Sequence, residues 1–285
     1  KLSFRHREVF GKVGCGTGGW DSDFPNTLLE ILRVVLTGCD EDQHLIVGGV
    51  QQVPLGLWAH APEQITHWPA GTSLARLHGG ATRPGVTAIA RGGMGWQVRT
   101  AAGDFTGRVL VNAAGAWVDQ VARMAGMQPL GFTPNRRSMA RIPAPGGHDI
   151  SGWPMMFGVG ELWYAKPDAG ALIVSPAEEH PMDPHDAWAD DMVLAEGLAR
   201  YEEFVTEPVT RLISNWAGLR TFAPDRVLVI GPDKHDPSFF WLAGQGGYGF
   251  QSCPAASQLA ADLISGRASE LSAELIASLS PARFG

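Results

Sequence analysis

Apolar and polar residues alternate most clearly in the part of the chain that starts at residue 96. Residues 96–100 alternate, residues 101–104 have the composition of a turn, and residues 105–111 form a second extended segment that ends in the apolar run Val109–Val111. Alternation on both sides of a short turn is typical of a β-hairpin. The pattern predicts a hairpin followed by an apolar strand in which Val109–Val111 are buried.

A turn of small residues and a helix follow this strand. Residues 113–116 carry side chains no larger than a methyl group, and the segment from Trp117 to Ala125 is predicted to be a helix that ends at Gly126. Glycine is common just past the end of a helix because it adopts a left-handed conformation without steric cost. The unit is therefore strand, tight turn, helix.

The middle of the chain, residues 127–215, has the pattern of a different layer. Alternating segments at 138–142 and 162–165 are separated by turns at 145–147 and 167–170. Short alternating segments between glycine turns favour antiparallel strands. This part is predicted to form a mixed or antiparallel sheet.

One amphipathic helix is predicted in this middle part, over residues 187–205. Its apolar residues recur every three or four positions from Leu194 to Val205, which gives the helix one buried stripe. Asp186 is the expected N-terminal cap, because a carboxylate accepts hydrogen bonds from the first free N–H groups of a helix.

The strand-turn-helix order returns near the end of the chain. Apolar strands are predicted at 227–231 and 239–243, and four of the six residues of the loop 244–249 are glycines. A helix is expected to open at Pro254 and to end at Gly266. Together the patterns predict an α/β (α+β) fold.

Composition narrows the function. The chain has 285 residues and a net charge of −7, from 22 Lys and Arg against 29 Asp and Glu. A general nucleic-acid binder or a polybasic membrane-surface protein carries a positive balance, so both classes are disfavoured. No apolar run approaches the ~18–20 residues that span a bilayer. We expect no nucleic-acid partner, no membrane span and a cytoplasmic location.

The cysteines and histidines predict no metal site and no disulfide framework. The three cysteines, Cys15, Cys39 and Cys253, are far apart and form no CxxC pair. Cys253 is expected to be a small buried packing residue. The His and Asp residues at 180–186 are interrupted by prolines and are expected to belong to a solvated loop.

Two segments of small residues predict a ligand site. The glycine loop 244–249 leads toward a helix N-terminus, where free N–H groups favour negative charge on a ligand. Residues 113–117 follow a strand, and their small side chains would let a flat cofactor lie over the backbone. The same residues also fit a plain strand-to-helix turn and ordinary helix–sheet packing.

Two arginines predict a site for a carboxylate. Arg137 and Arg220 both carry a planar guanidinium that can bind a carboxylate through two hydrogen bonds. Two converging guanidiniums would form a strong clamp. Surface ion pairing is the alternative for either arginine.

Several of these segments together resemble the FAD-dependent D-amino-acid oxidase family. Within that family, residues from about 108 to 285 most resemble the bacterial D-arginine dehydrogenases. The segments that carry the resemblance are 112–117, 135–138, 153–155, 164–170, 216–220, 225–231 and 240–251. They occur in the family's order, and their combination is specific.

The resemblance implies a role for each matching residue. Arg137 and Arg220 match the pair that holds the substrate carboxylate, and Tyr164 matches a tyrosine beside it. Residues that match the substrate pocket are Met155, Phe157, Gly247 and Tyr248. Residues that match contacts to FAD are Ala113, Ala114, Gly115, Trp117, Gln245, Gly246, Gly247, Tyr248, Gly249, Phe250 and Gln251. Phe157 stands where the relatives have a smaller aliphatic residue, so the pocket is expected to differ in shape.

The first 90 residues depart from this pattern and instead resemble flavin amine oxidases of the L-amino-acid oxidase or monooxygenase kind. The segments concerned are 14–21 and 48–54. Gly14, Gly16 and Gly19 fit GxGxxG, but Asp21, Asp23 and Pro25 follow where a helix would have to open. The ADP-binding start of an FAD/NAD(P)-binding fold is therefore expected to be missing.

The resemblance implies a domain division and an activity. The expected division is an atypical N-terminal segment at 1–95, FAD-binding parts at 96–126 and 216–270, a substrate domain at 127–215 and a C-terminal tail at 271–285. The expected activity is oxidation of the Cα–N bond of a D-amino acid by hydride transfer to FAD, which gives an imino acid and then a 2-oxo acid and ammonia.

Two alternative functions stay open. One is a flavin amine oxidase or L-amino-acid oxidase-like enzyme, and the other is a non-catalytic flavoprotein fragment. The expected partners are an amino-acid substrate and an electron acceptor, which the sequence leaves open among oxygen, a quinone and another carrier.

Overall fold

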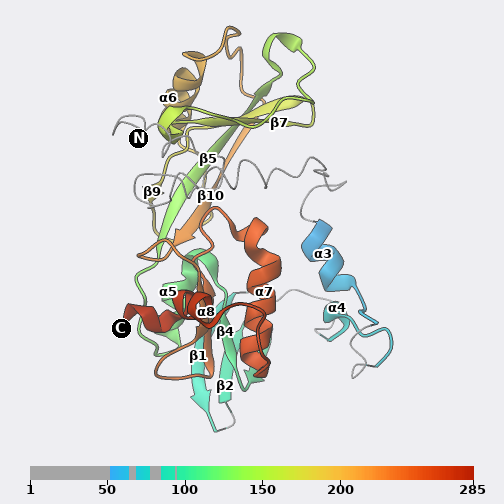
Figure 1. Ribbon diagram of the computed structural model, residues 1–285, viewed down its shortest axis with the longest axis vertical. Helices are drawn as coiled ribbons and strands as arrows, with labels where there is room; N and C mark the ends of the chain where they lie inside the picture. Colours follow the sequence, from blue (N-terminus) through green and yellow to red (C-terminus); the bar gives the residue numbers. More distant parts are fainter. Residues whose placement is uncertain (1–51, 64–68, 78–84, 94) are drawn as a thin grey trace.

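A computed structural model describes residues 52–63, 69–77, 85–93 and 95–285 (Figure 1). The glycine motif at 14–19 lies outside the described residues, and so does most of the segment 48–54. The domain boundaries given above stay a prediction.

The described strands form three sheets. The first sheet has the order β1-β2-β3, with β1 (Val86–Gly92), β2 (Gly95–Thr100) and β3 (Gly103–Gly107). The second has the order β10-β5-β8-β7-β6, with β10 (Ser214–Phe222), β5 (Thr133–Pro143), β8 (Ala171–Ser175), β7 (Tyr164–Asp168), β6 (Met156–Phe157) and, beside β5, β9 (His180–Pro181). The third has the order β11-β12-β4, with β11 (Val229–Pro232), β12 (Phe239–Ala243) and β4 (Leu110–Asn112).

Helices cover these sheets and connect them. The α-helices are α3 (Gln52–Ala59), α4 (Leu74–Leu77), α5 (Val118–Met124), α6 (Asp191–Glu202), α7 (Gly249–Ser265) and α8 (Ala273–Leu279). Short 3₁₀ helices are η1 (Gly115–Trp117), η2 (Pro145–Gly147), η3 (Val159–Glu161) and η4 (Pro281–Phe284). The mixed α/β composition and the mixed and antiparallel sheets confirm the predicted fold class. Of the described helices, none combines the length and the apolar character needed to cross a membrane.

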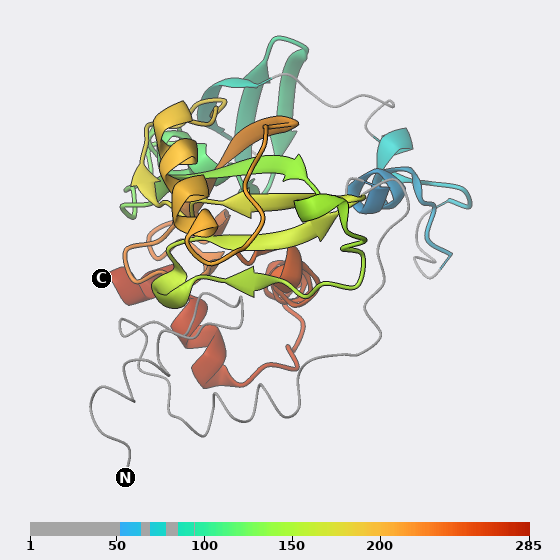
Figure 2. The same cartoon turned by 90° about the horizontal axis from the view of Figure 1, so that it is seen from above.

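The second sheet is built on the long antiparallel pair β5 and β10, which runs between the two halves of the molecule seen in Figure 1. Helix α6 lies across one face of this sheet, as Figure 2 shows from above. Leu194 and Tyr201 of α6 are fully buried, and Tyr201 belongs to the same apolar cluster as Ile142 and Val174. The opposite face of the sheet is left for the site described below.

The N-terminus of α6 differs from the prediction. The helix starts at Asp191, and its cap is Asp190, whose carboxylate accepts hydrogen bonds from the N–H groups of Met192 and Val193. Asp186 was wrong as the cap, because residues 186–190 are not helical and the first helical turn forms only from Asp191. The buried stripe from Leu194 onward is confirmed.

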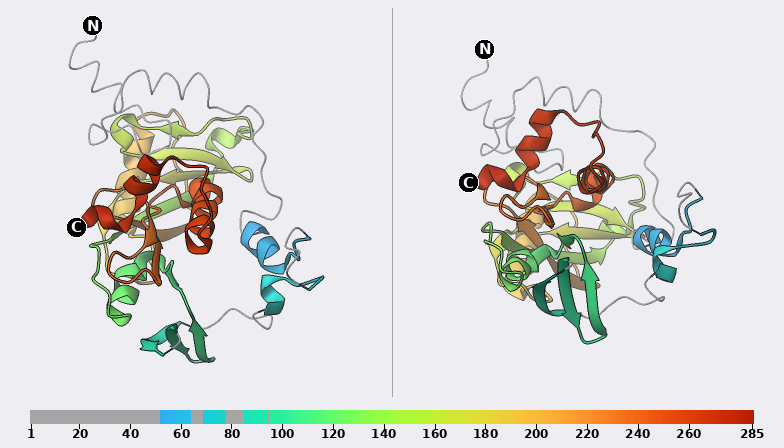
Figure 3. Two further views of the ribbon diagram at one scale, coloured as in Figure 1. Left: turned by 60° about the horizontal axis from the view of Figure 1, so that its bottom comes forward. Right: turned by 90° about the horizontal axis from the view of Figure 1, so that it is seen from below.

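The third sheet is packed on both faces. On one face Val118 and Ala122 of α5 pack with Phe239 and Trp241, all completely or almost completely buried. On the other face α7 and α8 pack against Ile230 and Phe240. The lower half of Figure 1 and both views of Figure 3 show these helices around the sheet.

The strand after the hairpin is shorter and less buried than predicted. Only Leu110–Asn112 is extended, and Val109 and Val111 are each 40% exposed. Leu110 packs against the cluster around Trp241, whereas α7 does not reach Val111 on the other face. The prediction that Val109–Val111 are all buried is therefore wrong, because successive residues of a strand point to opposite faces.

Helix α7 also begins earlier than predicted. It starts at Gly249 and ends before the left-handed Gly266, so that Pro254 lies inside the helix. A proline there removes the N–H that would bond to the carbonyl of Phe250. The thiol of Cys253 donates to that carbonyl at 3.1 Å instead. Cys253 is exposed, so its predicted burial is wrong.

Candidate functional site

The register of β5 and β10 places the two predicted arginines on one face of the second sheet. Arg137 lies opposite Gly218, and Arg220 is two residues further along β10, opposite Asn135. Residues opposite one another share a face, as do residues two apart on one strand. Arg137 and Arg220 are therefore diagonal neighbours, on the face that α6 does not cover.

Tyr164 joins the two arginines on this face. Nη2 of Arg220 donates a hydrogen bond to the Tyr164 hydroxyl at 3.3 Å, and Cζ of Arg137 lies 5.8 Å from the centre of the Tyr164 ring. The hydroxyl in turn donates to the sulfur of Met139 on β5 at 3.5 Å. The three side chains predicted to surround a carboxylate thus lie together.

The residues predicted to wall the pocket lie next to Tyr164 or before β6. Phe157 pairs with Tyr164 across β6 and β7, and their ring centres are 6.0 Å apart. Met155, directly before β6, is 44% exposed. Their role as pocket walls stays a prediction.

Arg220 is a largely buried cation that has no carboxylate partner among the described residues. Tyr164 is the hydrogen-bond partner of its guanidinium. Burial, followed by the charge of Arg137, lowers the pKa of Arg220 below its ordinary value. A desolvated guanidinium beside a second one is an unfavourable arrangement that a bound anion would relieve.

The glycine loop lies directly against this arginine. A Cβ on Gly247 would lie only 2.9 Å from Nη1 of Arg220, and a Cβ on Gly246 would collide with the Phe222 ring. The N–H of Gly246 donates to the carbonyl of Thr221 at 2.9 Å, which fixes the loop on the end of β10. Glycine is required at 246, where φ is positive and the Phe222 ring leaves no space for a Cβ, whereas a side chain at 247 would displace the Arg220 guanidinium.

The two small-residue turns lie at the same edge of the third sheet. Strands β4 and β12 run parallel and adjacent, with Asn112 opposite Trp241, so their carboxyl ends meet. Asn112 holds the first turn, because its buried amide donates to the carbonyl of Val118 at 2.8 Å. At the carboxyl ends of parallel strands, ligands have access to backbone and helix starts.

The surface around these turns is apolar and open. Trp117 is 43% exposed and Phe250 is 58% exposed. Helix α7 begins in the second turn, and its cap residue Tyr248 makes no side-chain hydrogen bond to the first N–H groups. Burial raises the pKa of Tyr248, so this phenol is neutral below pH 10. The remaining predicted contacts, Gln245 and Gln251, lie at either end of the same turn.

The groups that hold Arg137 were not predicted from the sequence. Nε of Arg137 donates to the carbonyl of Glu178 at 2.9 Å, and Nη2 forms an ion pair with Glu179 at 3.2 Å. Glu179 also binds Arg226 at 2.8 Å. These residues lie in loops, where the sequence has no hydrophobic periodicity from which their distant contacts can be predicted.

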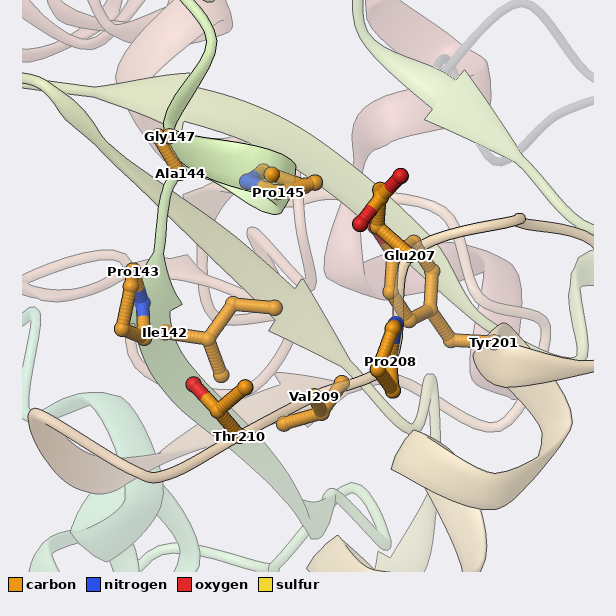
Figure 4. A pocket seen from close by; sticks show the side chains of 11 residues that line it. Ile142, Pro143, Ala144, Pro145, Gly147, Tyr201, Glu207, Pro208, Val209 and Thr210 are labelled. Atoms are coloured by element: carbon orange, nitrogen blue, oxygen red, sulfur yellow. The ribbon is translucent and has the colours of Figure 1, made fainter.

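A separate cavity of about 320 Å³ lies in the same half of the molecule but away from the arginines (Figure 4). It is lined by Ile142–Gly147, Tyr201 and Glu207–Thr210. Ile142 is on the α6 face of β5. The residues that line the cavity are mainly apolar. This cavity contains neither arginine and is distinct from the candidate site.

Across the described segments no group of His, Cys, Asp and Glu is arranged to hold a metal ion. Of the residues at 180–186, His180 and Pro181 form β9 beside β5, and His185 makes a local contact from Nδ1 to the Asp183 carbonyl at 2.6 Å.

Comparison with known proteins assigns the fold. The fold resembles glycine oxidase from Geobacillus kaustophilus, with a TM-score of 0.58 and 21% identity over 70% of this chain and 52% of that one. It also resembles L-proline dehydrogenase from P. horikoshii, with a TM-score of 0.58 and 21% identity over 70% of this chain and 53% of that one. The present chain therefore spans about half the length of either structure.

Sequence comparison identifies the family of the chain. The chain is 31% identical over 132 residues to the tRNA 5-methylaminomethyl-2-thiouridine biosynthesis bifunctional protein MnmC of Thiobacillus denitrificans, which is 42% of this chain and 21% of that protein. The model of the FAD dependent oxidoreductase family, DAO, matches residues 41–263. Because this match covers well over half of the chain, the protein belongs to the DAO family of FAD-dependent oxidoreductases.

Proposed function

We propose that this chain supplies the substrate-binding face of an FAD-dependent oxidoreductase that oxidises the Cα–N bond of a D-amino acid. The observation that carries the proposal is Arg220, a largely buried guanidinium with Tyr164 and Arg137 beside it and no carboxylate partner among the described residues. A substrate carboxylate would supply the anion that pairs with this guanidinium.

The described residues fit the flavin end of FAD, the cofactor of this family. Small residues at 113–116 and glycines at 244–249 leave backbone accessible at adjacent strand ends, and the half-exposed Trp117 and Phe250 offer apolar surface. The open N-terminus of α7 favours the partial negative charge of a flavin ring edge. FAD, when bound there, supplies the acceptor for the hydride that leaves the substrate Cα.

The chain's own residues bind and orient the substrate. Arg220 and Arg137 hold the carboxylate from two sides, and Tyr164 adds a hydroxyl within hydrogen-bond distance of Arg220. Because Gly247 touches Arg220, a carboxylate on Arg220 lies next to the loop that faces the cofactor. Fixing the carboxylate at this point aims Cα at the flavin and reduces the entropy cost of the reaction.

The choice of a D-amino acid rests on the residues at 137, 155, 164 and 220, which match the D-amino-acid oxidase pattern in type and order. The two similar structures are described as enzymes of glycine and of L-proline, which supports an amino acid as the substrate class. The stereochemical preference is the finer part of the proposal and needs its own test.

The test is an absorbance spectrum of the chain after incubation with FAD and removal of free cofactor. The proposal expects retained flavin bands that are bleached without oxygen by D-amino acids and not by their L-enantiomers. Bleaching by L-amino acids alone would favour the amine-oxidase alternative. Failure to retain flavin would favour a non-catalytic fragment. Return of the bands on admitting oxygen, or only with a quinone or dye, identifies the electron acceptor.

A further inference from the structure

One carboxylate at the rim of the candidate site is shared by two arginines. Oε1 of Glu179 accepts hydrogen bonds from Arg137 at 3.2 Å and from Arg226 at 3.0 Å, and Oε2 accepts from Arg226 at 2.8 Å. The Arg137 side chain is 10% exposed, whereas those of Glu179 and Arg226 are each 34% exposed. The pair of Glu179 and Arg226 thus lies on the solvent side of Arg137.

The position of Arg226 connects this pair to the glycine loop. Cζ of Arg226 lies 4.0 Å from the centre of the Phe222 ring, and Phe222 is the ring against which Gly246 packs. Arg226 has a positive φ of 62°, which turns the chain there after Asp225. The charges of Arg226, Glu179 and Arg220 also act on the phenol of Tyr248, the cap residue of α7 at the end of the glycine loop.

The sum of the charges beside Arg220 gives Glu179 a defined effect on an anionic ligand. Arg137, Arg220 and Arg226 contribute three positive charges, and Glu179 neutralises one of them while occupying donors of two. Glu161 adds a further negative charge that acts on Tyr248. A substrate carboxylate on Arg220 therefore meets a favourable field, whereas a second carboxylate that extends toward Arg137 would meet the negative charge of Glu179, which is hydrogen-bonded to Arg137.

We propose that Glu179 is a specificity-determining residue that restricts the site to amino acids with one carboxylate. Its charge repels a side-chain carboxylate, and its two hydrogen bonds with Arg226 keep that arginine from acting as a second anion site. This inference rests on the proposed function, because it assumes that the α-carboxylate binds at Arg220.

The first experiment compares D-glutamate with D-glutamine, which differ in charge and hardly in size. In the flavin-loaded wild type, kcat/KM should be much lower for D-glutamate. In Glu179→Gln, the ratio of kcat/KM for D-glutamate to that for D-glutamine should rise about tenfold to a hundredfold, the effect of removing one nearby negative charge at an intermediate dielectric constant. The matched control is Glu270→Gln, at an exposed position before α8, which should leave the ratio unchanged.

A second experiment measures binding without catalysis. Titration calorimetry with butyrate and with glutarate compares one and two carboxylates on simple chains. Glu179→Gln should lower the Kd of glutarate about tenfold or more and change the Kd of butyrate less than about threefold. An unchanged preference between the two ligands, or no binding of either to any variant, would overturn the inference.

Arg226→Gln provides the opposite perturbation and a safeguard if Glu179→Gln does not fold. It removes a positive charge and leaves Glu179 paired with Arg137 alone, so discrimination against D-glutamate should become stronger. Weaker discrimination would contradict the role of Glu179. A wild type that oxidises no amino acid refutes the proposed function, whereas the butyrate and glutarate titrations still decide the role of Glu179.

Discussion

Replacing Arg220 by methionine separates the binding role of this residue from its effect on the fold. Methionine keeps an unbranched apolar side chain on the same face of β10 and removes the guanidinium. The change takes away the hydrogen bond to Tyr164 and a desolvated positive charge that lies near Arg137. We therefore expect opposite effects on function and on stability.

The loss in function follows from the value of a charged hydrogen bond. One such bond to a carboxylate contributes about 1.5–3 kcal/mol, which corresponds to about tenfold to 150-fold in binding or catalytic efficiency. In Arg220→Met the KM of the amino acid should rise by that factor, while retained flavin stays the same because the substitution leaves the backbone of the glycine loop and of the turn at 113–117 unchanged. Steady-state kinetics and the flavin absorbance after desalting measure the two quantities.

The stability of the variant should stay equal to that of the wild type or increase. Burial and the charge of Arg137 disfavour the Arg220 cation, and the charge of Glu179 and the Tyr164 hydrogen bond offset this only in part, so its removal costs little or is favourable. Urea unfolding followed by tryptophan fluorescence gives the comparison. The control is Arg211→Met, an exposed arginine in the loop before β10, which should change neither quantity. Unchanged KM in Arg220→Met, or a loss of stability as large as the loss in binding, would refute the carboxylate role.

Three further predictions test the contacts around the site and in the core. Gly247→Ala should displace the Arg220 guanidinium, because the new methyl would lie 2.9 Å from Nη1, and should raise KM with flavin retained; Gly152→Ala, with open space around it, is the control. Tyr201→Phe should be neutral or stabilising in urea unfolding at pH 8, because the buried hydroxyl has no hydrogen-bond partner among the described residues. Burial and then Glu202 raise the pKa of Tyr201. The phenol therefore ionises first in the unfolded state, and the wild type loses stability as pH rises above about 10. Tyr201→Phe should lose less stability over the same pH range. Asp119→Ala should cost about 1–3 kcal/mol in unfolding free energy, because Asp119 accepts hydrogen bonds from three successive N–H groups at 130–132, and Asp119→Asn should recover part of the loss.

Local patterns predicted the strands well where a short apolar or alternating run is followed by a turn. Residues 239–243 form β12 as predicted, and the turn at 167–170 joins β7 to β8 through a left-handed Ala169 and Gly170. These features depend on a few neighbouring residues, so the sequence contains what is needed to identify them. The helix starts were less accurate: Asp190 and Asp186 are equally good caps by type, and only the packing of α6 on the sheet selects between them.

The candidate site was predictable as a set of residue types but not as an arrangement. Nothing in the spacing of Arg137 and Arg220 shows that they are diagonal neighbours, because that relation follows from the register of β5 and β10. Glu179 and Arg226 could not be found at all, since both act across loops on residues far away in the chain. Pair contacts of this kind depend on the folded chain and leave no periodicity in the sequence.

The glycines of the loop 244–249 illustrate how the two levels combine. Their density shows that the backbone approaches something closely, and the sequence alone allows either a ligand or a packed turn. The structure shows the packed turn, in which Gly246 packs on Phe222 and Gly247 on Arg220, and it leaves Gly247 exposed on its other side. The loop therefore sets the position of the Arg220 guanidinium and at the same time presents an open backbone next to it. A substrate carboxylate held by Arg220 would have to lie beside this loop, which is the physical reason that carboxylate binding and cofactor contact are expected to depend on the same glycines.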